Sequence, residues 1–298
     1  MNQILNWKEF LLQEENKKVY VFDFDDTIAE TNDLIGILRL IDGKPVKSMS
    51  QELINMGIQE EDIKKITPSK KYKGSGIAWI TTKGYKDYMN AVKKTADSEI
   101  EKNGSELKGV ITLVYDRVSD VDDENDDDDE NDNMSGITDM IDFTTSAHID
   151  LDTKPVPSMI KLAKNVNKNP DITVGVVTAR KGTTDMTSID GQTIKATNKE
   201  DIVKWLKKHG IKIDSTNVYG AADFGKKDFP KIKADIVDKK FIERIKPDSI
   251  HFFDDDPRNG KAVSEIPDSE SDIYVYTGDF AKGDIPNKPI FVKGKNKE

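Results

Sequence analysis

The chain has 298 residues, of which 36% are hydrophobic and 34% are charged, and it contains no cysteine. This length is enough for one large domain or two modest ones, and the lack of cysteine excludes disulfide bonds and thiol chemistry. No apolar run approaches the roughly 18 residues that a membrane span needs. Residues 1–18 carry acids and lack the apolar core of a signal peptide. We therefore expect a cytoplasmic protein that does not associate with a membrane.

The formal net charge of −10 is confined to one segment of the chain. Eleven acidic residues and one base, Arg117, lie between Asp116 and Asp132, while the remaining 44 basic and 44 acidic residues balance. A nucleic-acid-binding protein usually has a basic excess or stripe, and none is evident here. Because like charges repel and this segment has little to bury, we predict that residues 116–145 form a disordered linker.

Five short apolar runs predict the strands of a parallel sheet. They are KKVYVFDFD from Lys17, ITVGVVTAR from Ile172, TNVYGAAD from Thr216, SIHFFDDD from Ser249 and DIYVYTGD from Asp272. Helical patterns at 156–168, 199–211 and 238–247 separate most of them. Strands that alternate with helices are typical of βαβ units. We therefore predict an α/β core, a Rossmann-like parallel sheet flanked by helices, built from residues 1–33 and 146–298.

Roughly 140 residues separate the first two strands, far more than an ordinary connection. This stretch contains extended patterns at 34–43, 76–82 and 109–116 and a helical pattern at 85–101. We interpret residues 34–115 as an inserted α+β module. Later in the chain, the Asp-Gly pair within 188–197 predicts a tight hairpin.

Acidic residues follow two of the predicted strands. Asp23 and Asp25 follow the first strand, and Asp254, Asp255 and Asp256 follow the strand that begins at Ser249. In open α/β sheets, ligands bind at the carboxyl ends of the strands. Clustered carboxylates there suit Mg²⁺ together with a substrate phosphate. One carboxylate can act as a nucleophile, and an acid two residues later can act as general acid and base.

Two further residue types would complete a phosphate site. Thr178 ends the second predicted strand in a hydroxyl that can hold a phosphate oxygen. A lysine is needed to balance the negative charge. Lys239 and Lys240 begin the helical pattern before the fourth strand, and Lys233 is a further candidate.

These motifs resemble those of the haloacid dehalogenase (HAD) superfamily phosphatases. That family has an apolar strand followed by Asp-x-Asp-x-Thr, a second strand that ends in Ser or Thr, a lysine ahead of the fourth strand, and paired acids after it. The matching positions are Asp23, Asp25 and Thr27, then Thr178, then Lys239 or Lys240, and finally Asp254 and Asp255. The resemblance covers residues 18–33 and about 155–280, with the motifs in the family's order.

The resemblance implies a Mg²⁺-dependent phosphatase that works through an aspartyl-phosphate. Asp23 would be the nucleophile and a metal ligand, and Asp25 the general acid and base, with its backbone carbonyl on the metal. In the fourth motif we favour Asp255 as the ligand and Asp254 as the partner of the lysine, although the third acid, Asp256, leaves this register open. The inserted module would then be a cap that closes over the site.

Two alternative functions stay open. A polynucleotide phosphatase acting on nucleic-acid ends would need a basic groove, for which PSKKYKGSG at 68–76 is the one hint. A non-catalytic binding module with the HAD fold would have no need of both Asp23 and Asp25. We therefore expect an enzyme whose substrate is a small phosphorylated molecule; the sequence carries no signal for its oligomeric state.

Overall fold

The computed structural model describes residues 17–31, 33–42, 44–64, 77–103, 111–115, 137–188, 193–225, 228–267, 269–284, 289 and 291–293. The chain divides into two compact units. Unit 1 comprises Met1–Thr31, His148–Thr184 and Thr197–Glu298, and unit 2 comprises Asn32–Ala147 and Asp185–Ala196.

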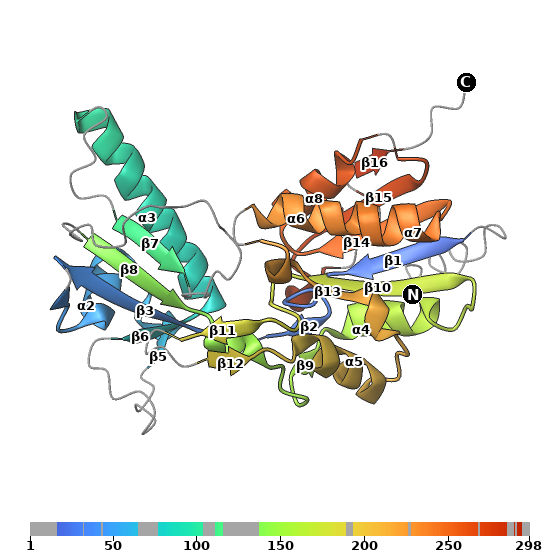
Figure 1. The fold of residues 1–298 in the computed structure, drawn as a ribbon, viewed down its shortest axis with the longest axis horizontal. Helices are drawn as coiled ribbons and strands as arrows, with labels where there is room; N and C mark the ends of the chain where they lie inside the picture. Colours follow the sequence, from blue (N-terminus) through green and yellow to red (C-terminus); the bar gives the residue numbers. More distant parts are fainter. Residues whose placement is uncertain are drawn as a thin grey trace, which may run out of the picture. The chain divides into compact units, whose positions relative to one another are not determined.

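Unit 1 is built on a six-stranded sheet with the strand order β13-β10-β1-β14-β15-β16 (Figure 1). The first five strands are parallel, and β16 pairs antiparallel with β15. A mixed α/β fold with a parallel sheet is thus confirmed, and the antiparallel edge strand is an addition to it. The strands are β1 (Lys18–Phe22), β10 (Ile172–Thr178), β13 (Val218–Gly220), β14 (Ser249–Asp254), β15 (Asp272–Thr277) and β16 (Phe291–Lys293).

Helices cover both faces of this sheet, and each face has its own hydrophobic core (Figure 1). In β1, Tyr20 and Phe22 pack toward α4 and α5, whereas Val19 and Val21 pack toward α6 and α8. Because both faces are buried, the strand is apolar at successive positions instead of at alternate ones. The helices are α4 (Pro157–Val166), α5 (Asn198–Lys208), α6 (Phe229–Ile236), the π-helical turn η5 (Val237–Ile242), α7 (Glu243–Ile245) and α8 (Pro257–Ser264).

The predicted strands and helices of unit 1 are present, with ends that differ by a few residues from the predicted ones. The main difference is the helix before β14. It begins at Phe229 and not near residue 238, because Asp228 caps its amino end and accepts a hydrogen bond from the Lys231 N–H (3.4 Å). The remaining short elements of unit 1 are β2 (Ala29–Glu30), β9 (Lys154–Pro155), η3 (Ser215–Asn217), η4 (Ala221–Asp223) and η6 (Phe280–Lys282).

Unit 2 is an α+β module that contains the strands and the helix predicted within residues 34–115. It is larger than predicted, because it extends to Ala147 and includes Asp185–Ala196, which we expected in the core. Its main sheet has the order β5-β6-β3-β8-β7, with β4 also paired to β3. The β7–β8 pair is parallel and the other pairs are antiparallel. The elements are β3 (Leu34–Ile41), β4 (Lys44–Pro45), α2 (Met49–Asn55), η1 (Glu60–Asp62), β5 (Ile63–Lys64), β6 (Ala78–Thr81), α3 (Thr82–Asn103), β7 (Ile111–Tyr115), β8 (Ile137–Asp142), η2 (Thr144–Ala147), β11 (Asp185–Thr187) and β12 (Thr193–Lys195).

Two predictions about the connecting segments have a mixed outcome. Residues 137–145, which we expected in the linker, form β8 and the start of η2, while the acidic tract at 116–132 lies outside the described residues. The arms of the predicted hairpin pair antiparallel as β11 and β12, whereas its Asp-Gly turn at 190–191 also lies outside them.

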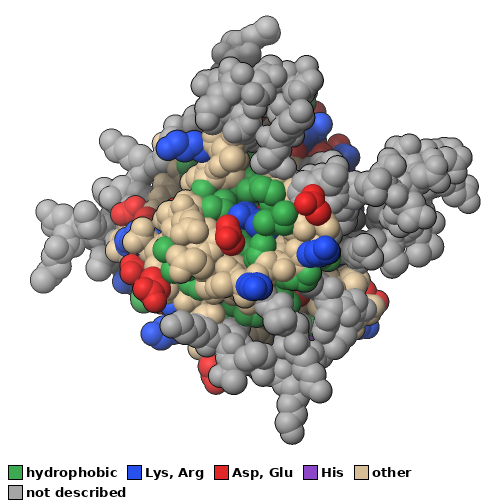
Figure 2. Space-filling model, turned by 90° about the vertical axis from the view of Figure 1, so that its left-hand side faces the viewer, with side chains coloured by type: hydrophobic (Ala, Val, Ile, Leu, Met, Phe, Trp, Pro, Cys, Tyr) green, Lys and Arg blue, Asp and Glu red, His purple; other side chains and the backbone are tan. Residues whose placement is uncertain are grey.

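Unit 2 carries partly exposed apolar residues, since Ile41 is 45% and Ile54 39% exposed. Figure 2 shows one face of the molecule, on which hydrophobic side chains gather around a basic side chain. Among the helices that the structure describes, none has both the length and the apolarity to cross a membrane.

Candidate active site

The candidate site lies at the carboxyl edge of the parallel sheet in unit 1. Strand β1 lies between β10 and β14, and Phe22 is in register with both Val176 and Phe253. The three strands therefore end side by side. The Asp23 N–H donates to the Phe253 carbonyl (2.8 Å) and so extends this pairing by one residue. The polar residues that follow β1, β10 and β14 thus meet at one place, as the sequence predicts.

A buried lysine joins the acids that follow β1 and β14. Lys233 Nζ donates to Asp23 Oδ1 (2.7 Å) and to Asp254 Oδ2 (2.8 Å). The Lys233 side chain is 2% exposed, and those of the two acids are 5% and 0% exposed. Burial alone would lower the pKa of Lys233, but the two carboxylates outweigh it and raise the pKa. The lysine is therefore a fixed positive charge between the two strand ends.

Lys239 and Lys240 are not the lysines in contact with these acids, and this corrects our prediction. The helix that carries all three lysines begins at the carboxyl edge of the sheet, where Lys233 contacts Asp23. It runs toward the amino edge, where the Asp248 N–H donates to the Lys17 carbonyl. Six residues of helix correspond to about 9 Å of rise, so Lys239 lies well away from the acids. Lys239 is exposed and Lys240 half-buried.

Both carboxylate oxygens of Asp254 accept hydrogen bonds from other groups of the protein. Its Oδ1 accepts from the Asp256 N–H (2.9 Å) and from Asn259 Nδ2 (2.9 Å), and its Oδ2 accepts from Lys233 and Asn259. This arrangement follows from local sequence, because Asp256 caps α8 and Pro257 begins it, which directs the first helical turn back toward the strand end. Asp254 therefore suits the predicted role as the partner of the lysine.

Asp23, Asp254 and Asp255 form the candidate metal centre, with one carboxylate oxygen from each within 4.8 Å of the others. Asp255 is held in place by its N–H, which donates to Thr27 Oγ1 (3.0 Å). Burial raises the pKa of Asp23 well above its ordinary value; Lys233 opposes this rise, and the charges of Asp254, Asp25 and Asp255 add to it. One lysine thus leaves the site with excess negative charge, which a divalent cation with oxygen ligands would neutralise.

Asp25 lies outside that group and faces a different set of partners. Its Oδ2 accepts from Thr178 Oγ1 (2.9 Å), and its Oδ1 accepts from Arg180 Nη2 (2.6 Å). Burial raises the pKa of Asp25, but the charge and hydrogen bonds of Arg180 and the bond from Thr178 outweigh it and hold the pKa below its usual range. Thr178 is therefore at the site, although its hydroxyl contacts Asp25 in this structure.

Two residues of the site had no role in the sequence interpretation, namely Arg180 and Asn259. Asn259 could have been found from the sequence, because Asp256-Pro257 is typical of the start of a helix and Asn259 then lies in its first turn. Arg180 follows β10 and so lies at the expected edge of the sheet, but nothing in the local sequence shows that its side chain pairs with Asp25.

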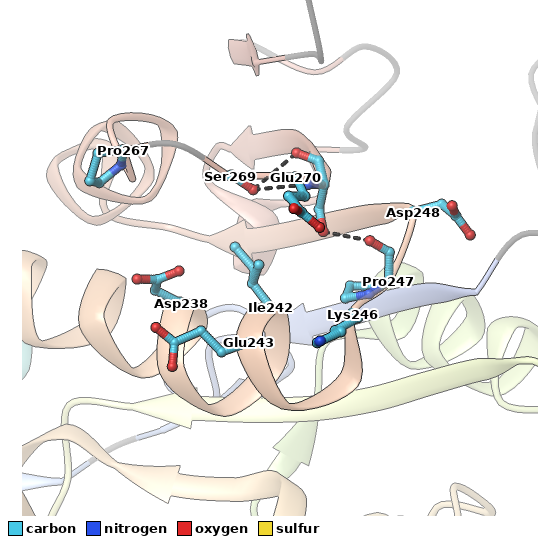
Figure 3. Close-up of a pocket in the computed structure, with 10 residues that line it drawn as sticks. Asp238, Ile242, Glu243, Lys246, Pro247, Asp248, Pro267, Ser269 and Glu270 are labelled. Carbon is cyan, nitrogen blue, oxygen red and sulfur yellow. Dashed lines mark hydrogen bonds between the residues drawn. The ribbon is translucent and has the colours of Figure 1, made fainter.

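A pocket of about 460 Å³ lies elsewhere in unit 1 (Figure 3). It is lined by residues of η5 and α7 and by the segments that precede β14 and β15, including Lys246, Asp248 and Glu270. This is the amino edge of the sheet, opposite the clustered acids. None of the site residues predicted from the sequence lines it.

The basic segment at 68–76, the one sequence hint of a nucleic-acid groove, lies outside the described residues. Comparisons of the chain with protein-family models, with curated proteins and with solved structures found no significant match.

Proposed function

We propose that the protein is a Mg²⁺-dependent phosphohydrolase of the HAD type that cleaves a phosphate monoester. The observation that carries this proposal is the cluster of Asp23, Asp254 and Asp255, in which Lys233 bonds to the first two. Asp25 lies two residues from Asp23 at the same sheet edge. The order of these residues along the chain and their roles follow the resemblance described for the sequence.

The donor set fits Mg²⁺, because Asp23 and Asp255 offer hard oxygen ligands at a site with excess negative charge. Asp254 would orient Lys233 and complete the cluster. When bound, Mg²⁺ would neutralise phosphate oxygens and so stabilise the charge that develops during phosphoryl transfer. Lys233 would supply a second, permanent positive charge beside Asp23.

The reaction would use two carboxylates in two steps. In the first step an oxygen of Asp23 forms a bond to phosphorus, and the bond from phosphorus to the leaving oxygen breaks. Asp25, which must be protonated in the substrate complex against the effect of Arg180 on its pKa, gives its proton to that oxygen. In the second step Asp25 takes a proton from water, the water oxygen bonds to phosphorus, and the bond to Asp23 breaks. Inorganic phosphate leaves and Asp25 is protonated again.

The decisive test is Asp23→Asn, assayed with nitrophenyl phosphate and with an alkyl phosphate, each with and without Mg²⁺. This substitution keeps the shape of the side chain but removes the anionic nucleophile, so activity should vanish on both substrates. Asp26→Asn is the matched control. Asp26 has φ of 57°, a conformation that asparagine tolerates well, and it is not one of the three clustered acids.

A second readout does not depend on turnover. Beryllium fluoride with Mg²⁺ mimics an aspartyl-phosphate and should raise the melting temperature of the wild type, since it binds the native state only. The Asp23→Asn variant should lose this rise and Asp26→Asn should keep it. Hydrolysis by Asp23→Asn at a rate near that of the wild type would instead indicate attack by a metal-activated water.

A further inference from the structure

Both carboxylate oxygens of Asp25 are held by residues at the end of β10. Arg180 donates from Nε to Oδ1 (2.9 Å) and Oδ2 (3.0 Å) and from Nη2 to Oδ1 (2.6 Å), and Thr178 Oγ1 donates to Oδ2 (2.9 Å). The Arg180 N–H also donates to Thr178 Oγ1 (3.3 Å). Because a guanidinium is planar and rigid, these paired bonds fix the plane of the carboxylate as well as its position.

The loop that carries Arg180 is itself anchored on both sides. The Lys181 carbonyl accepts from Asn198 Nδ2 (2.8 Å), and the Gly182 carbonyl accepts from the Lys199 N–H (3.1 Å). The Gly182 N–H donates to Asp223 Oδ2 (3.0 Å). The start of α5 and the turn after β13 therefore hold the backbone next to Arg180.

Strand β13 also contacts this loop directly through Gly220. A Cβ atom at Gly220 would lie 2.4 Å from the Arg180 carbonyl oxygen and 2.3 Å from the Gly182 nitrogen. No side chain fits there unless the backbone moves. The position of Arg180 thus depends on a glycine that is not itself part of the acid cluster.

We propose that Arg180 is a positioning residue that holds the Asp25 carboxylate in the orientation needed for proton transfer. This inference rests on the proposed function. It gives a role to Arg180, which takes no part in the two reaction steps described there. Asp25 gives its proton to the leaving oxygen and recovers one from water, whereas the guanidinium keeps all its protons throughout. Arg180 would act through Asp25, without contact with the transferred phosphoryl group.

Substrates with different leaving groups distinguish a residue that positions Asp25 from a residue that binds the phosphoryl group. The ratio kcat/KM reports the steps up to phosphorylation of Asp23, and nitrophenolate leaves without a proton. Arg180→Met should therefore leave kcat/KM for nitrophenyl phosphate close to the wild-type value. For an alkyl phosphate, whose leaving oxygen needs the proton, kcat/KM should fall on the order of 10²-fold, the cost of a misplaced catalytic group.

The second step gives an independent signature. Hydrolysis of the aspartyl-phosphate needs Asp25 as a base whatever the first substrate was. The kcat for nitrophenyl phosphate should therefore fall in Arg180→Met, and KM should fall by the same factor. Stabilisation by Mg²⁺ and beryllium fluoride should be retained, because Asp23 and the metal ligands are unchanged.

Three variants control the experiment. Arg244→Met removes an exposed arginine of unit 1 that bonds to Asn217, and it should match the wild type. Gly220→Ala keeps the guanidinium but displaces its loop, so it should shift both kinetic signatures in the same direction as Arg180→Met. In an Asp25→Asn background, Arg180→Met should cause no further loss, since both changes act on one carboxylate.

Some results would overturn the inference. An equal fall in kcat/KM for both substrates, or loss of the beryllium fluoride effect, would show that Arg180 binds the phosphoryl group. If Arg180→Met does not fold, Arg180→Lys supplies the same comparison, because it keeps the buried charge and loses the paired geometry. A wild type without Mg²⁺-dependent phosphatase activity would overturn the proposed function, and this inference with it.

Discussion

Each unit contains a buried arginine–aspartate pair, and the two pairs differ in what surrounds them. In unit 2, Arg39 and Asp139 lie opposite each other on β3 and β8, joined by two bonds of 2.7 Å. Tyr88 Oη also donates to Asp139 (2.6 Å). In unit 1, Arg180 and Asp25 lie beyond the ends of their strands, beside three more acids.

Exposure separates the two pairs further. The Asp139 side chain is fully buried, whereas 25% of the Asp25 side chain is exposed. An acid held in mid-sheet with no access to solvent can only stabilise the fold. An acid at the strand ends, held in the same way but open on one side, can exchange protons with a ligand. The same chemical pair is therefore structural in one place and a candidate for catalysis in the other.

The largest expected effect comes from breaking the pair in unit 1. Asp25→Asn should lower turnover of alkyl phosphates by about 10²–10⁴-fold, the usual loss when a general acid or base is removed. Mg²⁺ binding should persist, because the Asp25 carboxylate is outside the cluster of Asp23, Asp254 and Asp255. The variant should fold with reduced stability, because the buried Arg180 charge loses a carboxylate partner. Steady-state kinetics at neutral pH measures the effect. Turnover near that of the wild type would show that Asp25 is not the general acid and base. Asp25 would then be a structural residue, as Asp139 is.

The matching change in unit 2 should affect stability and not chemistry. Asp139→Asn removes the carboxylate bonded to the buried Arg39 and leaves the more distant Glu52 (3.6 Å) as its counter-ion, which should lower the free energy of unfolding by up to about 3–5 kcal/mol. Urea unfolding followed by circular dichroism would measure this loss. Turnover per folded molecule should stay close to that of the wild type.

A surface ion pair provides the control for that variant. Asp152 pairs with Lys208 (2.8 Å) and its side chain is 88% exposed. Asp152→Asn should leave the unfolding free energy nearly unchanged, because exposed pairs contribute little. Equal losses in Asp139→Asn and Asp152→Asn would show that burial does not distinguish the two sites.

A smaller effect is expected at a buried group that is surrounded by rings. His251 on β14 stacks on Tyr20 (4.4 Å between ring centroids) and Tyr274 (4.9 Å), and its Nδ1 lies 3.3 Å from Tyr276 Oη. Burial, with a smaller effect from the charge of Lys18, lowers the pKa of His251 to about 3. The folded state thus keeps this imidazole neutral where the unfolded chain would protonate it.

The unfolded state therefore binds more protons than the native state as the pH falls below about 6.5. Stability should be lost at up to about 1.4 kcal/mol for each pH unit between roughly pH 6 and 4 through this residue. His251→Phe should flatten that slope in urea titrations at several pH values. A slope that is unchanged in His251→Phe would contradict the shifted pKa.

The sequence by itself determined the class of the core and the acids of the site. Continuous apolar runs followed by acids mark buried parallel strands and their carboxyl ends, and this local signal was enough to place Asp23, Asp25 and Asp254 on the correct strand ends. The α+β character of residues 34–115 was also readable from periodicity. These features depend on neighbours in the chain.

The tertiary structure decided which cations meet those acids. Because the helix begins at Phe229, Lys233 lies beside the acids and Lys239 and Lys240 do not. A shift of six residues along a helix moves a side chain by about 9 Å. Arg180 reaches Asp25 across 155 residues of sequence because β10 lies beside β1 and Gly220 admits the loop after it. Such pairings depend on strand order and close backbone approach, which no local pattern of residues encodes.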